Sequence, residues 1–248
     1  MIILKSQDEI KRIAEACRIV AETLEGIKKM VAEGITTLEL DKFAEDFIIS
    51  KHATPAFKGY KGYSASLCTS VNEQVVHGIP STRKLDEGDI VSLDLGVYYR
   101  GFYGDAAVTL PVGKVGDEAK RLLMVTEEAL YEGIKNAFIG NRLFDISAAI
   151  QRHVEADGFS VVRDFVGHGI GRDLHEDPQL PNFGGPGQGP EIMEGMTLAI
   201  EPMVNAGSYE VFVLEDGWTA VTKDRSLSAH FEHTVAVTQE GPNPLTKL

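Results

Sequence analysis

The chain has 248 residues, 43% of them hydrophobic and 25% charged, and a formal net charge of −13. A surface this acidic repels phosphate backbones, which excludes nucleic-acid binding through a broad basic face. Its two cysteines, Cys17 and Cys68, are too few for a disulfide framework or a cysteine-based zinc site. No apolar run approaches the roughly 18 residues that a membrane helix needs, and the charged N-terminal stretch is unlike a signal peptide. We therefore expect a cytoplasmic protein with no membrane partner.

Two helices are predicted at the start of the chain. Ser6 opens the first with a capping box, and apolar residues then recur at helical spacing as far as Gly34. Thr36 opens the second helix in the same way. A β-rich stretch from about residue 64 to 112 follows.

The same order of elements is predicted a second time. A third helix runs from Asp117 to about Phe138, a fourth follows Gly140, and a second β-rich stretch completes the chain. Gly34 and Gly140 begin segments that align at a shift of 106 residues. Helix starts resemble one another, so those matches alone leave coincidence open, but the repeated element order favours duplication. We predict one α+β domain over residues 1–248, with duplicated halves of about 1–112 and 113–248 whose strands meet in one sheet.

Two aspartates mark the strand pair expected in residues 90–110. The turn is predicted near Arg100 and Gly101, so Asp94 and Asp105 lie on opposite arms. Across a two-residue turn, residues whose numbers add to an odd total share a face, so these carboxylates are opposite each other or one diagonal step apart. Facing carboxylates repel unless a cation lies between them. The hairpin alone leaves both a metal site and a solvated pair near the turn open.

The second half has three comparable residues. His168 lies between two glycines in FVGHGIG, and Glu201 and Glu232 lie within strand-like apolar runs. A lone buried histidine is more often a core residue, and a lone strand glutamate is more often an exposed edge charge. Five such residues in one chain favour a shared role as metal ligands. Their donor set suits Mn²⁺, Fe²⁺, Co²⁺ or Zn²⁺, and two ions held by shared carboxylates would activate a water.

Five ordered motifs carry a resemblance to a known family. The segments VSLDLG, GFYGDAAVTLPVG, VGHGIGRDLHEDP, MTLAIEPM and SAHFEHTVAV resemble those of the bacterial type I methionine aminopeptidases. So do SLCTSVNEQVVHGIP and the first two helices, and the likeness covers essentially the whole chain. The resemblance implies the pita-bread fold, in which pseudo-two-fold α+β halves share a curved antiparallel sheet. It also implies metal-dependent removal of the initiator methionine from nascent proteins whose second residue is small.

The resemblance gives each candidate ligand a role. Asp105 and Glu232 would bridge two divalent ions, Asp94 would chelate one ion, and His168 and Glu201 would serve the other. Glu201 would also pass a proton from the attacking water to the leaving amine. Because oxygen-rich sites accept several metals, the sequence does not choose among Co²⁺, Mn²⁺, Fe²⁺ and Zn²⁺.

Other residues match the family's substrate site. His77, in VVHGIP, and His175, in DLHEDP, would hydrogen-bond the substrate around the scissile amide and stabilise the oxyanion. Without the resemblance, each would be interpreted as a turn or core histidine. Four residues match the methionine pocket, with ordinary core packing as the alternative: Tyr60, Tyr63, Cys68 and Trp218. The sequence departs from the family at Leu174, where an aromatic residue is expected, and at Phe57, where a smaller one is common.

The resemblance also implies partners. The substrate is the N-terminus of a nascent polypeptide, which places the protein near the ribosome surface, and nothing in the sequence demands a second subunit, so we expect a monomer. Asn72 and Ser228 match a loop that holds a monovalent cation in the family. Only 33 positions separate His168 from Glu201, which leaves no room for the insertion of the type II class.

Two other functions are alternatives. Another pita-bread hydrolase, a prolidase or proline-specific aminopeptidase, would carry an additional N-terminal domain, and Gly34 is reached too early for one. A non-catalytic binding protein on the same fold would have lost ligands or histidines, whereas all of these positions are filled.

Overall fold

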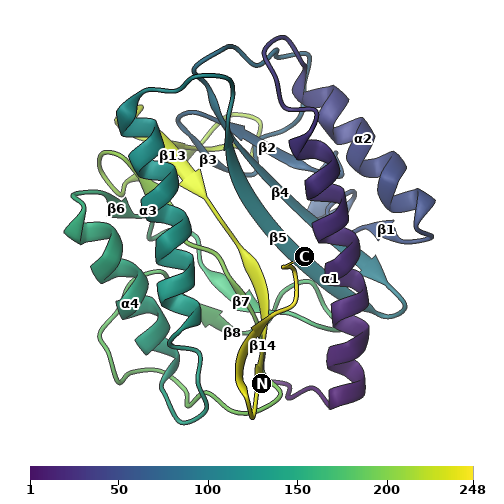
Figure 1. Ribbon diagram of the computed structural model, residues 1–248, viewed down its shortest axis with the longest axis vertical. Helices are drawn as coiled ribbons and strands as arrows, with labels where there is room; N and C mark the ends of the chain where they lie inside the picture. Colours follow the sequence, from purple (N-terminus) through teal and green to yellow (C-terminus); the bar gives the residue numbers. More distant parts are fainter. Residues whose placement is uncertain (248) are drawn as a thin grey trace.

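Two pairs of helices flank the strands in the computed structural model, which describes residues 1–247 (Figure 1). The first pair is α1 (Gln7–Lys28) and α2 (Thr37–Ser50), and the second is α3 (Asp117–Ile134) and α4 (Leu143–Ala156). None of these helices is both long and apolar enough to cross a membrane.

The strands are short except for two long ones near the middle of the chain. In order they are β1 (Thr54–Pro55), β2 (Cys68–Val71), β3 (Gln74–Val76), β4 (Ile90–Tyr99), β5 (Phe102–Pro111), β6 (Ser160–Val161), β7 (Gly167–Gly169), β8 (Glu176–Leu180), β9 (Thr197–Ile200), β10 (Met203–Asn205), β11 (Val211–Val213), β12 (Ala220–Thr222), β13 (Ser228–His230), β14 (His233–Thr238) and β15 (Gly241–Pro244). A 3₁₀ turn, η1 (Tyr60–Gly62), precedes β2.

The helix starts are confirmed, and two helix ends are earlier than predicted. Ser6 and Thr36 both form capping boxes. However, α1 ends at Lys28, because the chain beyond it turns and Gly34, at a φ of +87°, donates its N–H to the carbonyl of Leu85 at 2.8 Å. The third helix likewise ends at Ile134, where a turn carries the chain away from the helix axis.

Each helix pair covers its own hydrophobic core. Side chains of α1 and α2, such as Val20 and Leu40, pack with Leu93 of β4, while those of α3 and α4 pack with Leu198 of β9 and Val235 of β14. A core under each helix pair agrees with a duplicated architecture, because each pair then buries its own apolar faces.

The predicted hairpin is confirmed in its turn and its register. Arg100 and Gly101 both have positive φ, as a tight two-residue turn requires. In β4 and β5, Asp94 pairs with Ala107 and Gly96 with Asp105, so the two aspartates are one diagonal step apart on one face.

The strands of the two halves meet at β5 and β14. The N–H of Glu232 donates to the carbonyl of Ala107 at 2.9 Å, and the Thr234 hydroxyl donates to the carbonyl of Asp105 at 2.8 Å. One continuous sheet was predicted, whereas in residues 1–247 the strands form four hydrogen-bonded sheets: β1-β4-β2 with β5 on β4, β13-β10-β6, β11-β12-β3, and β15-β14-β9-β7-β8. The contacts between β5 and β14 join the first and last of these, which brings residues of both halves together.

Candidate metal centre

The five predicted ligands surround one end of a cavity of about 180 Å³, and all five line it. They come from separate elements: Asp94 from β4, Asp105 from β5, His168 from β7, Glu201 just after β9, and Glu232 between β13 and β14. The nearest ligand atoms of Asp105, His168 and Glu232 lie within 4.8 Å of one another. Both halves therefore supply donors to one point.

Three carboxylates in this cluster have an oxygen without a hydrogen-bond partner among the described residues. These atoms are Asp94 Oδ1, Asp105 Oδ1 and Glu232 Oε1. Burial, reinforced by the neighbouring carboxylates, raises the pKa of Asp105 and of Glu232 well above the usual range. Burial also raises the pKa of Asp94 and of Glu201 to about 7. Such a cluster lacks positive charge, and divalent cations would supply it, so the donor set fits metal ions.

His168 is oriented as a metal ligand. Its Nδ1–H donates to the carbonyl of Gly169 at 2.9 Å, which leaves the Nε2 lone pair free toward the cluster. The glycine before His168 is also required by packing, because a Cβ on Gly167 would lie 2.4 Å from the carbonyl oxygen of Ala199. Glycine therefore lets β7 and β9 approach closely enough to hold the imidazole at the cavity end.

His77 lies in the cavity wall with a strained backbone. Its φ is +61°, a left-handed conformation that a residue other than glycine rarely adopts. The ring packs edge-on against Phe165, with 5.4 Å between ring centroids. Burial lowers the pKa of His77 to about 4, so the imidazole is neutral at neutral pH. A neutral ring in a strained position at the cavity suits a substrate contact.

His175 lies in the loop between β7 and β8 and faces the cavity. Its Nδ1 and the hydroxyl of Tyr60 are 2.8 Å apart, and its ring lies 4.3 Å from that of His168 between centroids. The surrounding protein and the nearby His168 lower the pKa of His175. The two predicted non-ligand histidines thus both line the cavity that the candidate ligands line.

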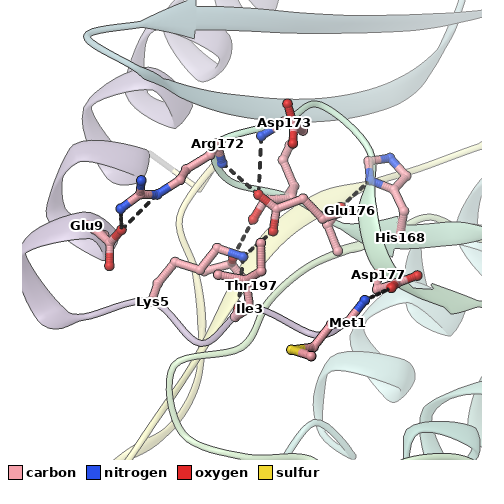
Figure 2. A network of polar contacts seen from close by, with 12 residues as sticks. Met1, Ile3, Lys5, Glu9, His168, Arg172, Asp173, Glu176, Asp177 and Thr197 are labelled. Atoms are coloured by element: carbon pink, nitrogen blue, oxygen red, sulfur yellow. Dashed lines mark hydrogen bonds and ion pairs between the residues drawn. The ribbon is translucent and has the colours of Figure 1, made fainter.

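The loop that carries His175 is anchored to the start of the chain (Figure 2). The Lys5 ammonium donates to Glu176, and both side chains are almost fully buried, at 2% and 3% exposure. Glu176 also accepts the backbone N–H of Arg172 at 2.7 Å and of Asp173 at 3.2 Å. A buried ion pair from a distant segment therefore fixes the residue next to His175.

The rest of the cavity wall is aromatic, apolar and sulfur-containing. All four predicted pocket residues line it, together with Phe57 and Leu174: Tyr60, Tyr63, Cys68 and Trp218. Tyr63 packs edge-on against Trp218, with 5.1 Å between centroids, and donates its hydroxyl to the carbonyl of Gly78 at 3.0 Å. Burial raises the pKa of the Cys68 thiol well above its usual value. A thiol that stays protonated suits a wall of the pocket better than a nucleophile.

The predicted monovalent-cation residues are engaged by protein partners. The Asn72 amide donates to Asp89 at 2.7 Å, and its Oδ1 accepts the N–H of Ile90 at 3.0 Å. The Ser228 hydroxyl donates to Asn205 at 2.8 Å. The monovalent-cation site at this loop stays a prediction.

One residue of the site was missed in the sequence. His230 is 1% exposed, and its Nε2 lies 3.5 Å from Glu201 Oε2. A usable signal was present, because His230 stands two positions before Glu232 in AHFEHT, and residues two apart in an extended chain face the same side.

Comparison with known proteins agrees with this geometry. The model of metallopeptidase family M24 matches residues 11–239. The methionine aminopeptidase of Clostridium perfringens is 58% identical over 248 residues, which is 100% of both chains. The crystal structure of methionine aminopeptidase from Thermotoga maritima has 50% sequence identity and a TM-score of 0.98 over 100% of both chains. The chain belongs to metallopeptidase family M24 and, within it, to the methionine aminopeptidases.

A more distant structure shares the fold alone. The prolidase from Pyrococcus horikoshii has a TM-score of 0.81 at 23% identity, and the match covers 99% of this chain and 63% of that one. Together these structures confirm the predicted α+β pita-bread fold. Membership of a metallopeptidase family confirms the expected use of divalent metal.

Proposed function

We propose that the protein removes the initiator methionine from nascent polypeptides whose second residue is small, using two divalent ions held by Asp94, Asp105, His168, Glu201 and Glu232. The observation that carries this proposal is the convergence of these donors, three of them with unpaired buried oxygens, on one end of a cavity with an aromatic and sulfur-containing wall. The first feature suits hydrolysis, and the second suits a methionine side chain.

The two ends of the cavity divide the substrate between them. The aromatic and thiol walls at Tyr63, Cys68 and Trp218 receive the methionine side chain, which packs well against aromatic rings. The acidic end receives the free α-amine and the scissile carbonyl. When bound, the divalent ions polarise that carbonyl and activate the attacking water.

Three side chains of the protein then act on the reacting groups. Glu201, with a pKa raised to about 7 by burial, accepts the water's proton and passes it to the leaving amine. Neutral His77 and His175 hydrogen-bond the peptide around the scissile amide and stabilise the oxyanion. For His77→Ala we expect a lower kcat with metal content preserved, and loss of metal would instead make His77 a ligand.

The preference for a small second residue is supported by the bulky side chains beside His175. The Tyr60 ring stacks on that of His175 with 5.2 Å between centroids, and Lys61 lines the same cavity. We propose that these side chains restrict the size of the residue after the scissile bond. We further propose Mn²⁺, Fe²⁺, Co²⁺ or Zn²⁺ as the ions, a monovalent cation near Asn72 and Ser228, and a cytoplasmic monomer acting near the ribosome.

The proposal is tested with peptides and added metal. Purified protein with Mn²⁺ or Co²⁺ should release methionine from Met-Gly-Met and Met-Ala-Ser, leave Met-Leu-Ser nearly uncleaved, and fail on N-formylated Met-Gly-Met, which lacks the free amine. Cleavage only before proline would identify another pita-bread hydrolase. No turnover with any of four metals would favour a non-catalytic binding protein.

A further inference from the structure

His230 is a buried histidine whose ring has no hydrogen-bond partner among the described residues. Neither Nδ1 nor Nε2 makes a hydrogen bond, although the side chain is almost fully buried. Its backbone is well fixed: its N–H donates to Thr109 Oγ1 at 2.8 Å, and its carbonyl accepts from the same hydroxyl at 2.8 Å. Buried polar groups are nearly always paired in folded proteins, so an unpaired one in a fixed position indicates a partner in the working state.

Glu201 is in place to be that partner. His230 Nε2 lies 3.5 Å from Glu201 Oε2, while His168 Nε2 lies 3.5 Å from Glu201 Oε1. The carboxylate therefore has one imidazole at each oxygen. His168 commits its N–H to the carbonyl of Gly169, so its Nε2 has only a lone pair to offer. Of the two rings, His230 alone can donate a hydrogen bond to Glu201.

We propose that His230 is a positioning residue for Glu201. Its Nε2–H donates to Oε2 and holds the carboxylate at one rotation, so that Oε1 keeps a fixed place at the ligand cluster. A carboxylate free to rotate presents its proton-accepting atom in the productive direction for only part of the time. The inference rests on the proposed function, because it assumes that Glu201 transfers a proton during peptide hydrolysis.

Two substitutions separate this role from simple packing. His230→Leu fills the space without a donor, whereas His230→Gln keeps an N–H at a similar reach. We expect kcat for Met-Gly-Met with Mn²⁺ to fall about 10–100-fold in His230→Leu, the usual cost of removing such a partner, with KM nearly unchanged. His230→Gln should recover most of kcat. The control is His153→Leu, a surface histidine that pairs with Glu128, which should match the wild type.

Two measurements do not depend on activity. Calorimetric titration with Mn²⁺ should give the same number of ions per chain in His230→Leu as in the wild type. Long-range ¹⁵N NMR of histidine-labelled protein should show the proton of His230 on Nε2.

The outcomes that overturn the inference are distinct. They are wild-type kcat in His230→Leu, equal loss in His230→Leu and His230→Gln, loss of bound Mn²⁺ in His230→Leu, or a proton on Nδ1. If the wild-type protein cleaves no peptide, the proposed function fails, and the NMR measurement still decides whether His230 donates toward Glu201.

Discussion

The two helix starts at Gly34 and Gly140 form the same structure from different sequences. Gly34 donates its N–H to the carbonyl of Leu85 at 2.8 Å, and Gly140 donates to that of Ile192 at 3.0 Å. The next two backbone hydrogen bonds are equivalent as well. The bond from Thr37 to Arg83 corresponds to that from Leu143 to Pro190, and the bond from Leu38 to Ser81 corresponds to that from Phe144 to Gln188. The glycines have φ values of +87° and +89°. The backbone hydrogen bonds at these two helix starts are thus repeated one for one.

The chemistry of the halves is not repeated. The first half supplies two aspartates from one long hairpin, β4 and β5, whereas the second supplies a histidine and two glutamates from three separate places. A duplicated framework therefore fixes where strands meet, and the side chains on them have diverged into complementary donors. Substitutions of donors should change activity greatly, and substitutions in the repeated framework should change stability slightly.

The largest effect is expected where the two halves meet, at Glu232. Glu232→Gln should abolish turnover of Met-Gly-Met and lower the number of bound Mn²⁺ ions, measured by elemental analysis. The same change should stabilise the metal-free protein, on the order of 1–3 kcal/mol, because it removes a buried carboxylate with an unpaired oxygen. Urea unfolding of the metal-free protein measures the gain in stability, and urea unfolding with Mn²⁺ measures the loss of the stabilisation that the bound ions provide.

Asp105→Asn is expected to behave in the same way, since Asp105 Oδ1 is also unpaired and buried. Glu210→Gln is the matched control, because Glu210 is an exposed acid paired with Lys223 at 2.9 Å. Retained wild-type turnover in either ligand variant would show that the bridging assignment is wrong.

Much of this arrangement could be predicted from the sequence because it depends on local rules. Capping boxes located the helix starts at Ser6 and Thr36, and the hairpin turn at Arg100 set the diagonal of the two aspartates. The shared role of the five ligands was inferred from their unusual positions in apolar or glycine-rich segments, and the family resemblance added the role of each one, since no local rule brings β5 beside β14. The Lys5–Glu176 pair was missed because its two residues are distant in sequence, whereas His230 was missed although its spacing from Glu232 was a usable signal.

The Lys5–Glu176 pair gives the next largest effect, because it ties the start of the first half to the His175 loop of the second. Lys5→Met leaves a buried carboxylate without its cation, and we expect a loss of about 3–5 kcal/mol in the free energy of unfolding. Adding Glu176→Gln should restore part of that loss. Lys11→Met is the control, because Lys11 is 75% exposed beside Asp8. Equal stability of Lys5→Met and Lys11→Met would contradict a structural role for the buried pair.

The ligand cluster should make the stability of the metal-free protein depend on pH. Burial raises the pKa of Asp94 and of Glu201 to about 7, so between their usual values and pH 7 the folded state binds more protons than the unfolded one. Stability from these groups is therefore lost as pH rises through about 7. The lowered pKa of His77 makes the stability rise with pH instead, but this rise is complete above the ordinary histidine pKa of about 6.5.

The test is thermal unfolding between pH 6.5 and 8. The Tm of the metal-free protein should fall over this range, and the stabilisation produced by Mn²⁺ should grow, because the ions bind the deprotonated carboxylates. Asp94→Asn should flatten the metal-free profile. A metal-free Tm that rises with pH would contradict the assigned protonation of the cluster.

The smallest effect compares the helix caps of the repeated framework. In α2, the Thr36 hydroxyl accepts the N–H of Glu39 at 3.2 Å, and Glu39 accepts the N–H of Thr36 at 2.8 Å. In α4, Asp145 accepts the N–H of Arg142 at 2.7 Å, but an arginine side chain cannot accept a hydrogen bond in return. In the second half of the molecule, α4 therefore has only one of the two hydrogen bonds of a capping box.

Removing the cap of α2 and completing that of α4 should change the free energy of unfolding in opposite directions. Thr36→Ala should cost about 1 kcal/mol in urea unfolding, and Arg142→Thr should add a similar or smaller amount by completing the second box. Activity per folded molecule should be unchanged in both, because neither residue lines the cavity. If Arg142→Thr destabilised the protein instead, the two helix starts would be alike in backbone only, with the arginine contributing a contact that the first half lacks.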